Sequence, residues 1–275
     1  MKIWSAWIQG RQNAPPVVQK IFSLWESLNP NAHFHVVENT QAKSIINGLG
    51  IDYQNLTPQV KANIIRTFLL KEYGGLWVDA TLLPTQPIDE WLCDLIPSGF
   101  FAFRSTGNPD LILQNWMLYS EPDHIIITSW LSEYCDYFRI TRYSENSKKI
   151  FLTKYAPHHF LFQYLWKRRE PSYFVDPRKG RFIRIYPYAM HNYTLAFLLK
   201  NRPGLAKYWS QVPTYFHIKP TLINYCSLDR ETSDSAFAAL ASELLPISPV
   251  HKLNSHDTRF LPMIEKAVSD GVICV

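Results

Sequence analysis

The chain has 275 residues, of which 47% are hydrophobic and 15% aromatic, and its formal net charge is +5. This composition excludes a disordered chain and is typical of an α/β or α+β globule with a large core. Four cysteines without paired or metal-ligand spacing, an N-terminus unlike a signal peptide and the lack of ~18 consecutive apolar residues argue against a secreted or membrane-spanning protein, so we expect a cytoplasmic one.

The first predicted elements alternate between strand and helix. Residues 3–9 predict a strand that ends in a polar turn, and Asn13 is expected to cap the helix that follows it. Residues 33–37 predict a short second strand. Thr40 is then expected to cap a helix that ends near Gly48.

The clearest helical pattern runs from Thr57 to Tyr73. Thr57 is a good N-cap, and Pro58 stands at the first helical position, where proline is favoured. Gly74 supplies the left-handed residue that commonly ends a helix. This segment therefore predicts a helix with well-defined ends.

Buried strands are predicted after this helix at residues 76–80 and 99–103. The alternation of strands and helices up to residue 105 predicts an α/β fold with a mostly parallel sheet flanked by helices. The rest of the chain is expected to be more helical, with helices at residues 123–138, 158–168, 191–200 and 233–245 and a strand at 250–253.

Asp79 is a lone carboxylate that directly follows the apolar residues LWV. In parallel sheets, ligands bind beyond the carboxyl ends of the strands, where this side chain is expected to lie. A carboxylate there suits Mg²⁺ or Mn²⁺, which in turn neutralises a substrate diphosphate. The alternative is an Asp that only caps a helix or forms a turn.

The sequence YGGLWVDAT, after a helix ending in IIRTFLLKE, resembles the DxD region of GT-A glycosyltransferases. It is most similar to the capsular polysaccharide synthesis proteins related to glycosyltransferase family 32. The segments IWSAWIQG, APPVVQ and SLWESLNP near the N-terminus resemble the same family. The resemblance covers most of the chain, is dense up to residue 103 and is thin from about 170 to 245.

This resemblance implies a single GT-A-like, Rossmann-like domain over residues 1–275, with a nucleotide-sugar-binding half (1–105) and an acceptor-side half (106–275). It implies a hexosyltransferase-type enzyme that moves a sugar from a nucleotide-diphosphate donor, such as a UDP-sugar, with retention of configuration. The implied acceptor is a saccharide or lipid-linked saccharide in bacterial capsule, O-antigen or lipooligosaccharide synthesis. The alternative is a non-catalytic relative that binds carbohydrate or nucleotide.

The resemblance also implies roles for particular residues. Asp79 and Arg66 would be catalytic, with Asp79 contacting the donor sugar or a Mn²⁺ or Mg²⁺ ion and Arg66 reaching the donor sugar or a phosphate. Thr81 stands where broader DxD enzymes have a second Asp, and Asn63 replaces a family Asp. Core packing for Trp7 and an ordinary helix-surface position for Arg66 are the alternatives. The donor-binding candidates are Trp7, Gln9, Asn63, Arg66, Gly75, Asp79, Thr81 and Lys252.

Two further groups of candidates lie later in the chain. His251, Lys252 and His256 are expected to close over the diphosphate, with Lys252 as a point charge and a histidine, His251, as a metal ligand. The alternative is a surface strand with exposed polar residues. On the acceptor side, the candidates are His158, His159 and Gln163.

The basic charge is regional. Residues 139–219 contain 16 Lys and Arg against 3 Asp and Glu, whereas the rest of the chain contains 12 against 20. Such a region suits an anionic membrane surface, which would place the protein at the inner face of the cytoplasmic membrane, or a phosphorylated acceptor. A solvated basic face is the alternative, and no nucleic-acid partner is expected because no reading motif is present.

Overall fold

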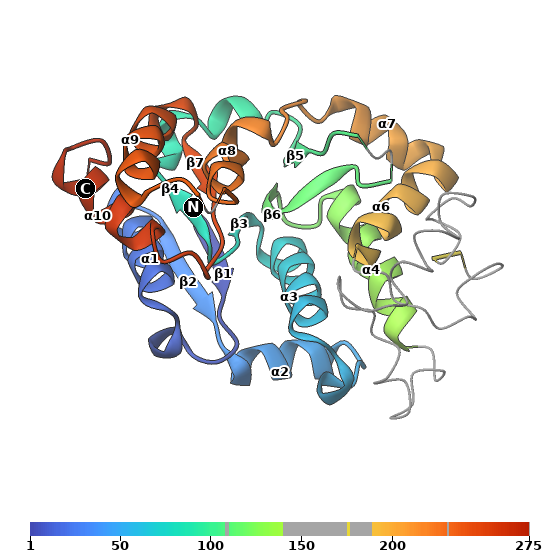
Figure 1. Cartoon of the computed structure of the whole chain (residues 1–275). Helices are drawn as coiled ribbons and strands as arrows, with labels where there is room; N and C mark the ends of the chain where they lie inside the picture. The colour runs from blue at the N-terminus through green and yellow to red at the C-terminus, as the bar shows by residue number, and fades with distance from the viewer. Residues whose placement is uncertain (108–109, 140–174, 177–188, 230, 275) are drawn as a thin grey trace.

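The computed structural model describes residues 1–107, 110–139, 175–176, 189–229 and 231–274 (Figure 1). The predicted helix at residues 158–168 lies outside these residues. Within the described part of the chain, no helix combines the length and apolar composition needed to cross a bilayer.

The centre of the fold is a five-stranded sheet in the order β2-β1-β3-β6-β5. The strands β1, β2 and β3 are parallel to each other, but β6 is antiparallel to both of its neighbours. The five strands are β1 (Lys2–Ala6), β2 (His33–Val37), β3 (Gly75–Val78), β5 (Phe100–Arg104) and β6 (Leu113–Ser120).

The α/β class is confirmed, but the sheet is mixed rather than simply parallel. The chain returns from β5 to β6 through the short connection 105–112. A parallel neighbour needs a long crossover, whereas a short connection gives an antiparallel pair. This connection therefore explains why β6 runs against the other four strands.

Helices cover both faces of the sheet (Figure 1). Neighbouring residues in β1 and β3 belong to opposite cores: Trp4 and Trp77 pack under α3, α4 and α6, while Ile3 and Leu76 pack under α1, α9 and α10. The helices are α1 (Pro16–Leu28), α2 (Asn39–Gly48), α3 (Pro58–Tyr73), α4 (Ile125–Arg139), α6 (Met190–Asn201), α7 (Pro203–Gln211), α8 (Ile218–Cys226), α9 (Asp234–Leu244) and α10 (Phe260–Ser269).

A separate two-stranded antiparallel sheet joins β4 (Leu82–Pro84) to β7 (Val250–Lys252). This sheet places β7, from the C-terminal part of the chain, beside the residues that directly follow β3. Short 3-10 helices complete the described structure at Arg11–Asn13, Tyr53–Asn55, Ile88–Glu90, Cys93–Leu95 and Leu245–Ile247.

The predicted ends of α3 are confirmed. The Thr57 hydroxyl accepts a hydrogen bond from the Val60 amide at 3.4 Å, and Gly74 ends the helix with a φ of 62°. A Cβ at Gly75 would collide with the carbonyl oxygen of Lys2, so this glycine allows β3 to lie against β1. Gly75 thus has a structural task at the start of β3.

The other predicted helix caps are wrong. α1 begins at Pro16, and the Asn13 side chain instead donates to the carbonyl of Gln9 at 2.7 Å. α2 begins at Asn39, which places Thr40 inside its first turn. The first strand also ends earlier than expected, because the residues after Ala6 form a turn.

Candidate active site at the carboxyl edge of the sheet

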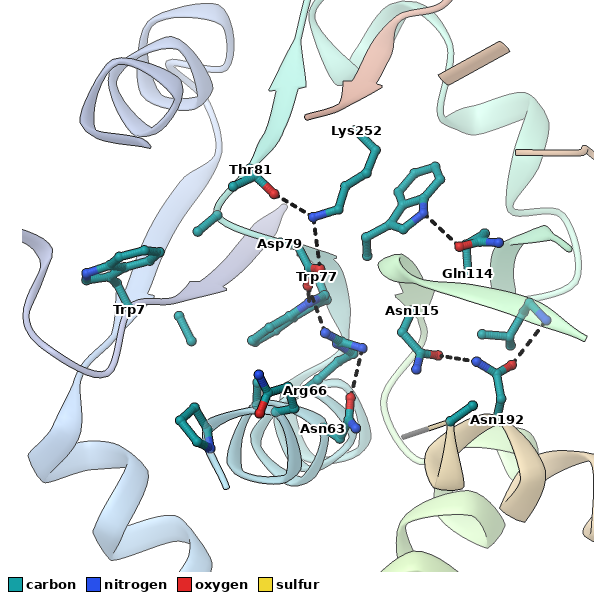
Figure 2. Close-up of a pocket in the computed structure, with 18 of the residues that line it drawn as sticks. Trp7, Asn63, Arg66, Trp77, Asp79, Thr81, Gln114, Asn115, Asn192 and Lys252 are labelled. Carbon is teal, nitrogen blue, oxygen red and sulfur yellow. Dashed lines mark hydrogen bonds and ion pairs between the residues drawn. The ribbon is translucent and has the colours of Figure 1, made fainter. Parts of the chain in front are cut away.

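A cavity of about 810 Å³ opens at one edge of the central sheet. Its walls come from the residues that follow β1 and β3, from one face of α3 and from the beginning of β6. Because β6 is antiparallel to β3, its first residues lie at the edge where β3 ends. Figure 2 shows Trp7 on one side of this pocket, Asn115 and Asn192 on the other and Asp79 between them.

The Asp79 carboxylate faces this cavity and is 28% exposed. Its backbone amide donates to the Trp116 carbonyl at 2.8 Å, and its own carbonyl accepts from Leu82 at 2.8 Å in a tight turn. The backbone therefore makes the turn while the side chain remains directed into the pocket. The described structure does not use Asp79 as a helix cap.

Arg66 is the main partner of this carboxylate. Its Nη2 atom donates to Asp79 Oδ1 at 2.7 Å, and its Nη1 atom donates to Asn63 Oδ1 at 3.2 Å. The guanidinium also lies 4.9 Å from the centre of the Trp77 ring. Only 4% of Arg66 is exposed, so the alternative of an ordinary helix-surface arginine is wrong.

Two more donors reach Asp79. Trp77 Nε1 donates to Oδ1 at 3.0 Å, and Lys252 Nζ lies 3.4 Å from Oδ2. Burial, the largest influence on this group, tends to raise the pKa of Asp79. The charges of Arg66 and Lys252, together with these hydrogen bonds, outweigh burial and lower the pKa, so the site holds an ionised carboxylate.

The β4–β7 sheet brings Lys252 into the pocket. Leu82 of β4 pairs with Lys252, and the Leu253 amide donates to the Thr81 carbonyl at 2.9 Å. As a result the Lys252 ammonium also donates to the Thr81 hydroxyl. The structure thus brings Lys252 together with Asp79 and Thr81.

The structure does not bring His251 to this site. Successive residues of a strand face opposite sides, and His251 is fully buried on the side away from Lys252. Its Nε2 atom donates to the Leu245 carbonyl at 3.0 Å, and burial lowers the pKa of the imidazole. Of the two expected histidines, His256 is the one that lines the pocket.

Binding of Mn²⁺ or Mg²⁺ at Asp79 stays a prediction, and the described residues offer such an ion few ligands besides this carboxylate. They contain no group of three or more His, Cys, Asp and Glu side chains able to hold a metal ion. Asp79 is the only acid among the described residues of the pocket wall, and donors already occupy both of its oxygens. Because Mg²⁺ is commonly held by one or two carboxylates together with substrate phosphates and water, an ion at this wall would depend on oxygens of the donor itself.

Trp7 and Gln9 lie in the turn after β1 and line the same cavity. Trp7 is half-buried and also packs against the core on the α1 side of the sheet. The alternative of core packing therefore holds for part of this indole, and stacking of its ring on a ligand stays a prediction. Gln9 is exposed, and its side chain is accessible to a ligand.

One side of the pocket was not predicted. There Asn192 accepts from the Leu113 amide at 3.2 Å and donates to Asn115 Oδ1 at 3.5 Å. Gln114 accepts from Trp116 Nε1 and donates to Ser105 Oγ, both at 3.0 Å. No spacing in the sequence marked these amides as pocket residues, because the sequence analysis predicted no strand at the position of β6.

The remaining candidates lie elsewhere. Gly75 begins β3, at the opposite end of the strand from Asp79, and does not line the pocket. His158, His159 and Gln163 lie outside the described residues, as does most of the basic region at 139–219. Acceptor contacts by these three residues and docking of this region to a membrane therefore stay predictions.

Comparison with known proteins identifies the family of this chain. The family model described as capsular polysaccharide synthesis protein matches residues 1–202, so the chain belongs to this family, as the sequence indicated. The putative glycosyltransferase HOC1 of Saccharomyces cerevisiae (strain ATCC 204508 / S288c) is 28% identical over 155 residues. This match spans 47% of the present chain and 38% of the length of HOC1.

Among solved structures, the PaToxG glycosyltransferase is similar at 13% sequence identity and a TM-score of 0.35. The match covers 71% of the present chain and 85% of PaToxG.

Proposed function

We propose that this protein is a GT-A-type glycosyltransferase of surface polysaccharide synthesis. It would transfer a sugar from a nucleotide-diphosphate donor to a saccharide. One observation carries the proposal: the Asp79 carboxylate stands at the mouth of a large cavity, held between Arg66 and Lys252. Membership of the capsular polysaccharide synthesis family and the partial similarity to HOC1 support the same reaction class.

The chemistry of the pocket fits the parts of such a donor. Arg66 and Lys252 offer positive charge to a diphosphate, and the indole of Trp7 offers a face on which a base can stack. Asn115 and Asn192 offer neutral amides, which both donate to and accept from sugar hydroxyls. A volume of about 810 Å³ lies within the usual range of small-molecule sites.

In the proposed reaction, the bond between the anomeric carbon and the diphosphate oxygen breaks as a bond to the acceptor oxygen forms on the same face. The departing diphosphate accepts the acceptor proton, so no separate general base is required. Positive charge placed beside the leaving diphosphate stabilises the transition state more than the bound donor. Asp79 keeps the Arg66 guanidinium and the Lys252 ammonium in position for this task.

The test is a panel of UDP-, GDP- and ADP-sugars incubated with the protein, with and without manganese, while release of nucleoside diphosphate is measured. We expect at least one donor to be cleaved and the Asp79→Asn variant to be slower by at least about 100-fold. A matched control is Asp270→Asn, because Asp270 pairs with Lys266 on the surface, far from the pocket wall. This control should retain the wild-type rate.

Asp79→Asn also removes the carboxylate partner of the buried Arg66, so its folding must be checked by circular dichroism and thermal melting. A folded Asp79→Asn protein with near-normal turnover would contradict the assignment of this residue. If the wild-type protein binds nucleoside diphosphates but never releases one from a donor, the alternative of a non-catalytic binding relative holds.

A further inference from the structure

The position of Lys252 suggests how the diphosphate is bound, provided that the function proposed above is correct. We propose that the Lys252 ammonium is the fixed cation of the diphosphate site, so that the protein binds nucleoside diphosphates without a divalent metal. Lys252 Nζ contacts Asp79 Oδ2 at 3.4 Å and also donates to Thr81 Oγ1. These are the first and third side chains of the D-A-T sequence, and Figure 2 shows the ammonium between them.

The backbone fixes this arrangement firmly. β7 pairs with β4 in register, with Leu82 opposite Lys252 and Pro84 opposite Val250. The neighbouring His251 is buried on the other side of β7 and donates to the carbonyl of Leu245. Lys252 is therefore the residue of this pair that must face the cavity, where its side chain is 23% exposed.

The charge balance opposes a metal ion at the same place. The described wall contains one carboxylate and two fixed cations, Arg66 and Lys252, close to that carboxylate. Thr81 contributes a hydroxyl where a second carboxylate would be needed to attract a divalent ion. A divalent cation entering beside two positive groups would meet like-charge repulsion, whereas an anionic diphosphate would be attracted.

A lysine ammonium can bind phosphate oxygens as a metal ion does, but it carries a smaller charge. It is a compact point charge with three donors that can rotate toward phosphate oxygens, and it needs no ligands beyond its own chain. Its single charge is smaller than that of Mn²⁺, and Arg66 supplies a second charge close to Asp79. Lys252 and Arg66 together thus provide the positive charge that stabilises the leaving diphosphate.

The experiment measures the binding of UDP and of GDP by calorimetry, in EDTA and in manganese. We expect the wild-type protein to bind at least one of them equally well in both solutions. In EDTA, Lys252→Gln should weaken this binding by at least about tenfold, because a charge-assisted contact to phosphate is lost. Lys266→Gln is the matched control, since Lys266 pairs with Asp270 on the surface, and it should bind like the wild type.

A second variant makes the test independent of simple loss of function. Thr81→Asp combined with Lys252→Gln replaces the ammonium by a second carboxylate, which creates an oxygen pair for a divalent ion. We expect this double variant to bind the nucleotide only weakly in EDTA and to regain affinity in manganese. Thermal melting of each variant confirms that it is folded.

The outcomes are distinct. Binding by the wild type that requires manganese would overturn the fixed-cation proposal and leave the proposed function intact. Lys252→Gln binding as tightly as the wild type in EDTA would also overturn it. If the folded wild-type protein binds neither nucleotide in either solution, the proposed function fails, and this inference fails with it.

Discussion

The two sides of the pocket differ in the kind of polar group that they present. The ionic side consists of Arg66, Asp79 and Lys252, held by α3, β3 and β7. The amide side consists of Asn115 and Asn192, together with Gln114, and is held by β6 and α6. A ligand that spans both sides therefore meets charge at one end and neutral hydrogen-bonding groups at the other, as a diphosphate joined to a sugar requires.

The two sides also differ in what a substitution leaves behind. On the ionic side, removing one partner leaves a largely buried charge without its counterion, which strongly lowers the free energy of unfolding. On the amide side, the same change leaves a neutral donor or acceptor unsatisfied, which costs less. The comparison therefore predicts a larger loss of stability on the ionic side.

The largest expected effect is that of Arg66→Gln. The change removes the guanidinium that bridges Asp79 and Asn63 inside the protein. We expect the free energy of unfolding to fall by about 2 to 3 kcal/mol, less than for a fully buried pair, because Asp79 keeps some exposure to solvent. Urea denaturation measures this change.

Arg11→Gln is the matched control for this measurement. Arg11 also forms an ion pair with a carboxylate, both of its contacts to Glu26 being 2.6 Å long, but this pair is exposed. Exposed pairs contribute less than about 1 kcal/mol. Equal losses in the two variants would show that burial of Arg66 does not set the stability of the ionic side.

The second prediction concerns the amide side, where two asparagines in contact differ in their backbone partner. Asn192 accepts from the Leu113 amide, and Leu113 is only 1% exposed, so Asn192→Ala leaves a buried donor unsatisfied. We expect a loss of about 1 to 2 kcal/mol for this variant. Among the described residues, Asn115→Ala removes only the 3.5 Å contact with Asn192 and should cost less than about 1 kcal/mol.

The same two variants test whether the sides have separate tasks. If the ionic side alone binds the diphosphate, both variants should bind UDP or GDP as the wild-type protein does. Calorimetry on the folded variants checks this. A large loss of nucleotide affinity in Asn115→Ala would mean that the division into a charged and a neutral side does not describe how the ligand lies.

The sequence predicted the ionic side better than the amide side because the signals of the ionic side are local. The N-cap at Thr57, the stop at Gly74 and the apolar run before Asp79 follow each other within 25 residues and require no knowledge of distant partners. These features placed Asp79 at the carboxyl edge of the sheet, and the family resemblance assigned Arg66 to the same site.

The amide side depends on β6, a strand without a regular alternation of polar and apolar residues. Both faces of β6 are covered: Met117 belongs to one core and Leu118 to the other. A strand covered on both faces has no periodic signal to recognise. The sequence also could not show which of His251 and Lys252 faces the pocket. The side of the sheet to which a strand residue points depends on the pairing register, which only the structure gives.

The smallest expected effect at neutral pH concerns the buried His191. It precedes Asn192 in α6. Its ring stacks on Trp130 with 3.9 Å between the ring centres and meets the Tyr134 ring edge-on with 4.7 Å between the centres. Neither ring nitrogen has a hydrogen-bond partner among the described residues. Burial, and to a smaller degree the charge of Arg66, lowers the pKa of His191 well below 6.5.

The sign of the resulting pH dependence follows from proton binding. Below about pH 6.5 the unfolded chain gains a proton at His191, whereas the folded protein keeps the ring neutral, so stability falls as the pH falls. His191→Phe keeps an aromatic ring in the stack and removes this proton uptake. We expect a change of less than about 1 kcal/mol near neutral pH, and below the unfolded pKa a gain for the variant that grows by up to about 1.4 kcal/mol per pH unit. Urea midpoints between about pH 5 and pH 8 measure both quantities. If the urea midpoints of the two proteins instead change in parallel with pH, folding does not lower the pKa of His191, and the ring takes up a proton in the folded state as well.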